Sequence, residues 1–436
     1  MTKLLCRVSE TQKGKQEVQN PFAVRTLLFQ SGERFPILMN SETGEPDFDT
    51  AVYVLTHLRG TAKASNTIEL HLRSIIVLKL YLQARTIDFS ERIRSCEMLQ
   101  PHELDELVKW CRRTLPDIIA DLRQAGTPKV AAVRFSPKYH TRVEICSQSG
   151  KNRIRAVSDF MDWFVRDRVS RLNTQDRNNS IKAWQTCRTS LEARTPRDRR
   201  RSQVGRREGA HPEMVTKLFA TVEPFSHANP WKSDHVKVRN QLIVHWLYYL
   251  GVRRGELLNI RISDINFRRE TVLVVRRADD IKDPRKDQPL VKTRDRDLPV
   301  GAALVSMTMD YITKHRAKCP GARMHEYLFV SERSGAPLSL SMVNEIFENI
   351  RESASDSFEG LSPHVLRHTW NDNFSERCDE LKLATGDEAS MRSYIMGWSP
   401  TSETAETYTR RHVRKKAQEV SLAMQEASFK PGERDE

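Results

Sequence analysis

The fold is decided above all by one stretch of the chain, LYYLGVRRGELLNIRISDI, which covers residues 247–265. Its first part is apolar, and Gly251 marks the end of a helix, because glycine adopts the left-handed backbone found at helix C-termini at little cost. A second helix is predicted to follow, with Glu256 and Leu257 facing inward. The stretch therefore predicts two helices joined at a glycine.

A second informative stretch is SPHVLRHT, residues 362–369. Proline is tolerated in the first turn of a helix and serine is a favoured N-cap, so Pro363 and Ser362 predict a helix start. His364 and Arg367 are three residues apart and therefore share one helix face. This face would carry a proton carrier beside a permanent cation.

Two further segments complete the pattern. Residues 270–277 are rich in β-branched residues and predict a strand, and after a charged insertion the segment PLVKTRDRDLPV follows at 289–300. Later in the chain, Gly397 and Trp398 precede Tyr408. A tyrosine in such a helix is ordinarily a surface residue, so Tyr408 gains meaning only from the segments around it.

Together these segments resemble the tyrosine recombinase (phage integrase) family. The matching motifs are Gly-hydrophobic-Arg-x-x-Glu-Leu, Lys-Thr-x-x-x-Arg-x-hydrophobic-Pro, His-x-x-Arg-His, Gly-Trp and an isolated tyrosine. The chain departs from the family in a longer segment between Arg367 and Trp398, in a hairpin shorter by one residue, in Trp398 where most members have His, and in Tyr408 lying one residue late. The resemblance implies this catalytic set: Arg253, Lys292, His364, Arg367, Trp398 and the nucleophile Tyr408. Lys282 and Lys286 remain alternatives to Lys292 because the charged insertion blurs the register.

The resemblance implies strand exchange through a covalent intermediate. The hydroxyl of Tyr408 would attack phosphorus, expel a DNA 5′-hydroxyl and leave a 3′-phosphotyrosine that another 5′-hydroxyl resolves. Lys292 would protonate the leaving oxygen and His364 would accept the proton of the tyrosine.

Positive charge on the phosphate would come from side chains, without cofactor or metal. Arg253 and Arg367 offer planar, permanently charged donors, and Trp398 would add its indole N–H. Glu256 either orients Arg253 or is a plain buried carboxylate, and we favour the first. His368 is expected to face elsewhere and to support packing.

Composition agrees with a DNA substrate. The 436 residues include 71 Lys and Arg against 57 Asp and Glu, a net charge of +14, which favours a polyanionic partner. Seven scattered cysteines argue against a zinc site or a disulfide scaffold. No apolar run reaches the length of a membrane span. We expect a cytoplasmic, bacterial protein that is nucleoid-associated when bound to DNA.

The expected fold is mainly α with a small antiparallel β-sheet, in a two-domain tyrosine recombinase architecture. The expected boundaries are an N-terminal segment and candidate arm (1–48), a helical core DNA-binding domain (49–188), an arginine-rich linker (189–210), a catalytic domain (211–425) and a polar tail (426–436).

Three predicted regions bear on DNA binding and assembly. A helix from about Gly150 would be apolar on one side and cationic on the other, through Lys151, Arg153 and Arg155, which suits either DNA phosphates or plain solvation. In the linker, Arg199, Arg200 and Arg201 would follow the DNA backbone. The apolar stripe of the last helix is too narrow for a core, and family members dock such a helix on a neighbouring protomer.

The expected partners are double-stranded DNA, a homotetramer on synapsed sites, and accessory DNA-bending or mobile-element proteins. The biological role would be integration or excision of a mobile element. Alternatives are a type IB topoisomerase or telomere resolvase, which share this chemistry, and a catalytically silent DNA-binding relative.

Overall fold

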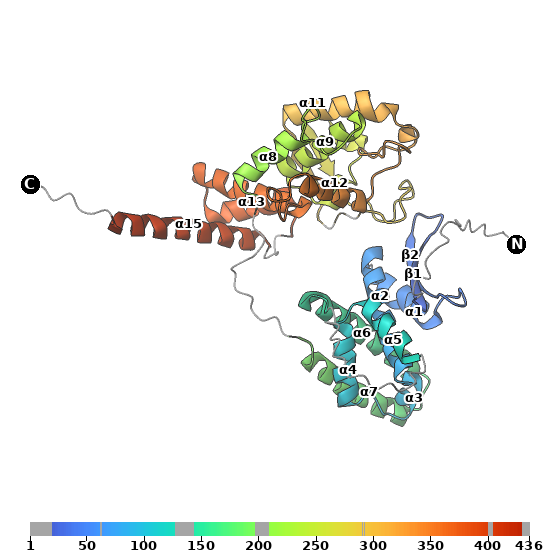
Figure 1. The fold of residues 1–436 in the computed structure, drawn as a ribbon. Coiled ribbons are helices and arrows are strands. Elements are labelled where there is room, and N and C mark those ends of the chain that lie inside the picture. Colours follow the sequence, from blue (N-terminus) through green and yellow to red (C-terminus); the bar gives the residue numbers. More distant parts are fainter. Residues whose placement is uncertain are drawn as a thin grey trace, which may run out of the picture. The chain divides into compact units, whose positions relative to one another are not determined.

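The computed structural model describes residues 20–61, 63–126, 144–196, 209–289, 291, 293–399 and 404–429. It divides into two compact units, the first formed by Met1–Phe29 and Arg34–Arg201, the second by Gln30–Glu33 and Ser202–Glu436. Figure 1 shows the elements of both. The predicted fold class, mainly α with small antiparallel sheets, is confirmed.

The first unit begins with an antiparallel hairpin, followed by helices. The strands are β1 (Phe22–Leu28) and β2 (Arg34–Asn40), paired from Phe22–Asn40 to Leu28–Arg34. The helices are α1 (Phe48–Tyr53), η1 (Val54–Arg59), α2 (Ser65–Ala84), α3 (Phe89–Arg94), α4 (Pro101–Cys111), α5 (Leu115–Gly126), α6 (Ser147–Val169) and α7 (Thr174–Ala193).

The core of this unit forms between the apolar faces of its helices and hairpin. The apolar stripe of α2, which includes Ile68, Leu72 and Ile75, is fully buried, and the hairpin contributes Phe35 and Leu38. Because these strand residues join the same core as α2, the hairpin is part of the first unit.

Helix α7 extends into the stretch expected to be linker. It continues to Ala193, and Leu191 is buried with Trp184 and Cys187. The 3–4 spacing of these three residues is a helical stripe that the many arginines obscure. Within the expected linker, Arg194 pairs with Asp105 at 2.7 Å, so at least one of those arginines belongs to the folded unit.

The second unit contains the remaining elements. Its helices are α8 (Pro212–Val222), α9 (Asp234–Leu250), α10 (Arg254–Leu257), η2 (Ile262–Asp264), α11 (Ala302–Asp310), η3 (Tyr311–His315), η4 (Arg316–Lys318), η5 (Ala322–Met324), α12 (Leu340–Ser353), α13 (Pro363–Glu380), α14 (Thr385–Met396) and α15 (Thr404–Phe429). Its strands β3 (Ile265–Asn266), β4 (Thr271–Val274) and β5 (Arg296–Pro299) form an antiparallel sheet in the order β3-β4-β5.

Helix α9 is the centre of the second core. Trp246 and Leu247 are fully buried, and the indole N–H of Trp246 donates to Thr308 Oγ1 at 3.1 Å. The predicted ends are confirmed: α9 stops at Gly251 with φ 57°, and Ser362 caps α13 by accepting from the backbone N–H of Val365. Helix α9 packs directly on α13.

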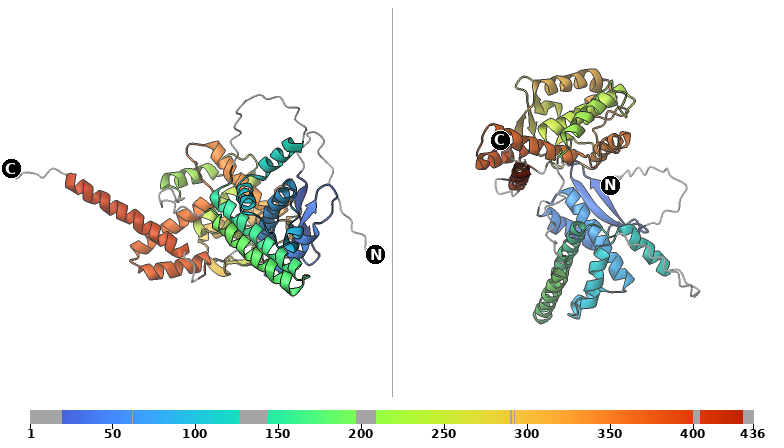
Figure 2. Two further views of the ribbon diagram at one scale, coloured as in Figure 1. Left: turned by 90° about the horizontal axis from the view of Figure 1, so that it is seen from below. Right: turned by 60° about the vertical axis from the view of Figure 1, so that its left-hand side comes forward.

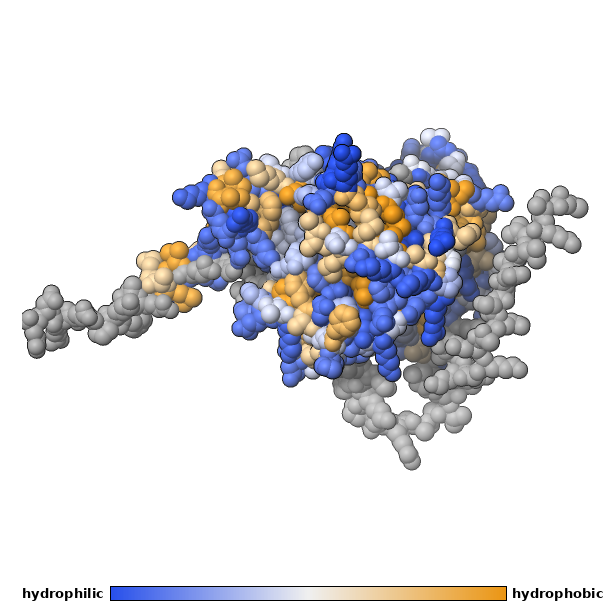
Figure 3. All heavy atoms as spheres, turned by 90° about the horizontal axis from the view of Figure 1, so that it is seen from above, coloured by the Kyte–Doolittle hydropathy of each residue, from blue (hydrophilic) through white to orange (hydrophobic). Residues whose placement is uncertain are grey.

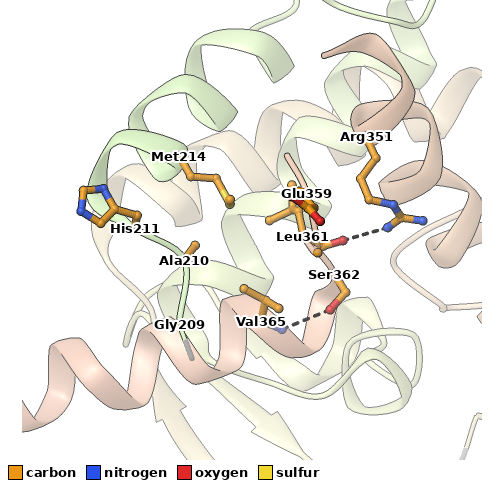
Figure 4. A pocket seen from close by; sticks show the side chains of 10 residues that line it. Gly209, Ala210, His211, Met214, Arg351, Glu359, Leu361, Ser362 and Val365 are labelled. Atoms are coloured by element: carbon orange, nitrogen blue, oxygen red, sulfur yellow. Dashed lines mark hydrogen bonds between the residues drawn. The ribbon is translucent and has the colours of Figure 1, made fainter. Parts of the chain in front are cut away.

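The backbone of Gly209 and Ala210, here called the strap, is hydrogen-bonded to side chains of α13. The N–H of Gly209 donates to Asp372 Oδ2 at 3.2 Å, and that of Ala210 donates to Thr369 Oγ1 at 2.7 Å. A Cβ at Gly209 would lie 2.8 Å from the backbone Cα of Thr369, so the close approach requires glycine. Figure 4 shows the strap beside a 680 Å³ pocket at the start of α13, where Arg351 donates to the carbonyl of Leu361.

The last helix, α15, projects beyond the rest of the second unit in Figure 1 and in the left view of Figure 2. Across the described residues, no helix combines the length and hydrophobicity that a membrane crossing requires.

Candidate active site

The candidate site is built where α9 and α13 cross. Gly251 ends α9 in the left-handed conformation, and its carbonyl accepts a hydrogen bond of 2.6 Å from Nη1 of Arg367. A Cβ at Gly251 would lie 2.7 Å from the ring of Trp370 on α13, so only glycine permits this approach. The turn at the end of α9 thereby fixes the guanidinium of Arg367.

Glu256 is a buried carboxylate that contacts three arginines. Its Oε1 accepts from Arg253 Nη1 at 3.2 Å, and its Oε2 accepts from Arg296 Nη2 at 2.9 Å and lies 3.8 Å from Arg367 Nη1. The hydroxyl of Thr293 donates to Oε1 at 2.7 Å. Arg253 therefore does contact Glu256, as expected, although Glu256 serves two further arginines.

The surroundings of Glu256 keep it ionised. Burial alone would raise the pKa of Glu256, but Arg296 and Arg367, with hydrogen bonds from the Arg253 backbone and Thr293, lower it to about 2. Burial, reinforced by Arg253, lowers the pKa of Arg367 to about 9, which leaves this guanidinium charged at neutral pH.

The site carries an excess of positive charge and buried hydrogen-bond donors without a partner among the described residues. Three guanidinium groups around one carboxylate leave two uncompensated positive charges in this cluster. Nη2 of Arg367 and Nε1 of Trp398 are buried and lack a hydrogen-bond partner among the described residues. The Arg367 guanidinium lies 5.5 Å from the Trp398 ring centroid. Buried donors are nearly always hydrogen-bonded. Two neighbouring buried donors without a partner therefore indicate a binding site for an acceptor such as a phosphate oxygen.

Tyr408 lies in the first turns of α15 and is 8% exposed. Its ring stacks on Trp398 with centroids 5.6 Å apart and an interplanar angle of 10°. Its hydroxyl is 2.9 Å from Nδ1 of His368. The oxygen expected to act as nucleophile is therefore hydrogen-bonded to an imidazole.

The expectation that His368 faces away from the site is wrong. His364 and His368 are four residues apart, one turn of helix, so they lie on the same face of α13, and their ring centroids are 4.3 Å apart. Of the two histidines, His368 is the one in hydrogen-bond contact with Tyr408, whereas His364 is exposed. A helical wheel applied to both histidines would have detected this.

The hairpin before β5 reaches the same cluster. Lys292 lies outside the described residues, while the adjacent Thr293 contacts Glu256. Lys282 and Lys286, the alternatives to Lys292, are both exposed. Arg254 contacts Asn344 rather than Glu256, so Arg253 is the arginine of this pair that enters the cluster.

Sequence reasoning missed Arg296. Its guanidinium is 1% exposed and contacts Glu256, Thr293 and the carbonyl of Ile395. The signal was present, because Arg296 matches the arginine of the family's Lys-Thr-x-x-x-Arg motif, which is one residue shorter here, and occupies an inward position of β5. Two of its partners, Glu256 and Ile395, however, lie 40 and 99 residues away and leave no local pattern.

The residues expected to bind DNA in the first unit differ in their surroundings. Arg153 donates to the carbonyls of Cys111 and Arg113, at 3.2 and 2.6 Å, so it ties α6 to the end of α4. Arg155 is exposed and Lys151 is half-buried. Arg199, Arg200 and Arg201 lie outside the described residues.

Comparison with known proteins gives a family match over the second unit. Residues 212–415 match the phage integrase family. Tyrosine recombinase XerC of Bacillus pumilus is 30% identical over 135 residues, which cover 30% of this chain and 39% of that protein. Tyrosine recombinase XerA of Pyrococcus furiosus is 26% identical over 189 residues, 43% of this chain and 56% of the relative. The chain thus spans about half the length of these relatives.

Among solved structures, a crystal structure of XerA recombinase is 16% identical, with a TM-score of 0.36, and the match covers 86% of this chain and 98% of that one.

We predict that Glu256→Gln lowers the free energy of unfolding by about 3 kcal/mol at neutral pH, because it leaves buried guanidinium groups without their counter-ion. The pKa of Glu256 in the folded protein, about 2, lies below its ordinary value of 4.5. The stabilisation is therefore complete above about pH 4.5 and is lost as the pH falls through 2. In thermal melts, the melting temperatures of the wild-type protein and Glu256→Gln should therefore converge as the pH falls from about 4.5 to 2.

The matched control is Glu359→Gln, since Glu359 is an exposed carboxylate of the same unit. It should change stability by less than about 0.5 kcal/mol at any pH. A stability gap for Glu256→Gln that stays constant from pH 7 to pH 2 would contradict the assignment.

Proposed function

We propose that this chain, whose residues 212–415 belong to the phage integrase family, is a site-specific DNA recombinase that cleaves and rejoins strands through a 3′-phosphotyrosyl intermediate. The observation that carries the proposal is the contact of the Tyr408 hydroxyl with His368, beside the buried donors of Arg367 and Trp398. A nucleophile, a base and anion donors thus meet in one place. The proposed role is integration or excision of a mobile element.

In the first step, the Tyr408 oxygen attacks phosphorus and a DNA 5′-oxygen leaves. We assign the acceptor of the tyrosine proton to His368, with His364 beside it as the next group in reach. This reassigns the role first expected for His364 alone. The stack of Tyr408 on Trp398 holds the phenol ring in one orientation, which lowers the entropy cost of attack.

Charge on the phosphate is met by three donors. Arg253 is about one-third exposed and Arg367 is buried, so one guanidinium faces incoming DNA while the other forms the floor of the site. The indole N–H of Trp398 is the third donor. Preorganised donors of this kind stabilise the transition state more than the ground state. We propose that these groups supply the positive charge without a metal ion or other cofactor.

The leaving 5′-oxygen needs a proton. We propose Lys292 as the acid, because it directly precedes Thr293, whose hydroxyl is bound to Glu256. Lys282 and Lys286 remain alternatives within the preceding insertion.

The proposed substrate is duplex DNA, held by both units. On the first unit we propose Lys151 and Arg155 as phosphate contacts, with Arg153 supporting α6 from within. Arg199, Arg200 and Arg201 are proposed to follow the backbone between the units. We place the reaction in the bacterial cytoplasm, and accessory DNA-bending proteins remain part of the proposal.

We propose that four copies assemble on two synapsed sites through α15. Val420 and Met424, which are four residues apart and therefore share one face of this helix, are 60% and 66% exposed, and Figure 3 shows hydrophobic side chains on its projecting part. An apolar face of this kind on a protruding helix suits a protein–protein contact. A second copy of the chain is the proposed partner.

Tyr408→Phe should abolish covalent attachment to DNA and leave DNA binding nearly unchanged, since only the nucleophilic oxygen is lost. The test is incubation with nicked suicide duplexes carrying the ends of the candidate element, followed by a denaturing gel. A wild-type protein that binds but forms no adduct would identify a silent relative. Relaxation of any supercoiled plasmid without site preference would identify a topoisomerase.

His368→Gln should slow adduct formation by about 10²-fold, the usual contribution of a general base. His364→Gln is the matched control on the same helix face and should slow it less. Both rates are measured on the suicide duplex at saturating protein. A larger loss for His364→Gln than for His368→Gln would return the base to His364.

Deleting residues 417–436 should leave a protein that binds one half-site but no longer fills full sites cooperatively. The same loss is expected for Val420→Ser combined with Met424→Ser. Ser421→Ala with Gln425→Ala is the control, because these exposed residues are polar. Gel-shift titrations on half and full sites measure the effect, and undiminished cooperativity in the deletion variant would rule out docking through α15.

A further inference from the structure

We propose that Arg296 is a positioning residue of the active site, which holds the hairpin before β5 and the turn before Trp398 against the Glu256 cluster. The proposal rests on the proposed function, because the segments that it positions carry the residues assigned to catalysis. Arg296 itself is buried beneath the site and has no assigned role in the reaction.

Each donor group of Arg296 contacts a different segment of the chain. Nη2 donates to Glu256 Oε2 at 2.9 Å, Nη1 donates to Thr293 Oγ1 at 2.9 Å, and Nε donates to the carbonyl of Ile395 at 2.6 Å. These acceptors belong to α10, to the hairpin and to the C-terminal end of α14. One planar guanidinium therefore sets the distances among three segments.

The end of α14 is fitted closely to this guanidinium. Gly397 has φ 65°, and a Cβ there would lie 2.8 Å from Arg296 Nη1 and 2.9 Å from Thr293 Cβ. The carbonyl of Gly397 accepts from the backbone N–H of Arg294 at 3.0 Å. Trp398 directly follows Gly397. The direction of its indole N–H, which lacks a partner among the described residues, therefore depends on the turn that Arg296 holds in place.

Arg296 also keeps Glu256 ionised. It is the foremost of the cations that hold the pKa of Glu256 low against burial. An ionised Glu256 accepts from Arg253 and attracts Arg367, whereas a protonated one would lose much of this attraction. Arg296 thus acts on the two phosphate-binding arginines through the carboxylate.

Packing alone does not explain an arginine at this position. Arg296 and Leu298 are the inward residues of β5, and an apolar side chain would fill such a position without the desolvation of a charge. The plain alternative is that Arg296 only stabilises the fold. The two roles separate experimentally, because a fold role changes stability, whereas a positioning role changes rate and pH dependence.

The test uses the full-length chain with a suicide duplex. We compare Arg296→Lys, Arg296→Met and Thr293→Val, and measure adduct formation from pH 5 to 9, DNA affinity and melting temperature. Arg296→Lys keeps the charge but cannot reach all three acceptors, so it should react about 10²-fold more slowly at every pH with unchanged DNA affinity. Thr293→Val should be slower by about tenfold.

For Arg296→Met, the rate of adduct formation should fall at low pH, which is an additional pH dependence. Without the cation, the pKa of Glu256 rises, so the carboxylate becomes protonated as the pH falls and the rate falls with it. Arg296→Lys should not show this loss of rate at low pH. If Arg296→Met does not fold, Arg296→Lys and Thr293→Val carry the test.

The matched control is Arg285→Met. Arg285 is also buried, pairs with Asp283 and donates to the carbonyls of Leu258 and Leu338, without contact to Glu256. It should lower the melting temperature while leaving the rate within about threefold and the pH profile unchanged.

Wild-type rates in both Arg296→Lys and Thr293→Val would overturn the positioning role. A loss of rate in the Arg296 variants that matches Arg285→Met at equal melting temperature would also overturn it. A wild-type chain that forms no adduct would instead overturn the proposed function, and the catalytic interpretation of Arg296 with it.

Discussion

The second unit depends on the burial of one carboxylate among three guanidinium groups. Glu256 has no exposed side-chain surface, so its charge persists only because Arg253, Arg296 and Arg367 surround it. Removing the carboxylate from such a cluster leaves buried guanidinium groups without a counter-ion, which costs far more than the pairs gain on formation. The excess of positive charge in turn makes the cluster ready to receive an anion.

Close backbone approach is the second constraint. Gly251 and Gly397 both adopt left-handed φ angles, and both lie where a Cβ would overlap a neighbouring side chain. The first brings a carbonyl to Arg367 and the second brings the Trp398 turn to the hairpin. Because two helices end within contact distance of the charged cluster, their terminal turns place side chains that no single helix could bring together.

Local pattern predicted the elements well where one residue type has one physical reason to be present. Gly251 ended a helix and Ser362 with Pro363 began one, as their backbone preferences require. The pattern was less informative in charged segments. The end of α7 was obscured by arginines, although Leu191 continued its apolar stripe. The helical period that places Arg367 on the same face as His364 also places His368 there, four residues after His364.

By itself the sequence determined the fold class, the helix ends and the set of residue types from which the site is made, because these follow from spacing and backbone preference along a short stretch. Only the tertiary structure decided which imidazole meets Tyr408, which arginines share Glu256, and that Arg296 joins three segments. The long-range contacts among these link residues 40 to 111 positions apart. Which residues pair is decided by the need of buried charges for a counter-charge in the folded core, and the local periodicity of the sequence does not show it.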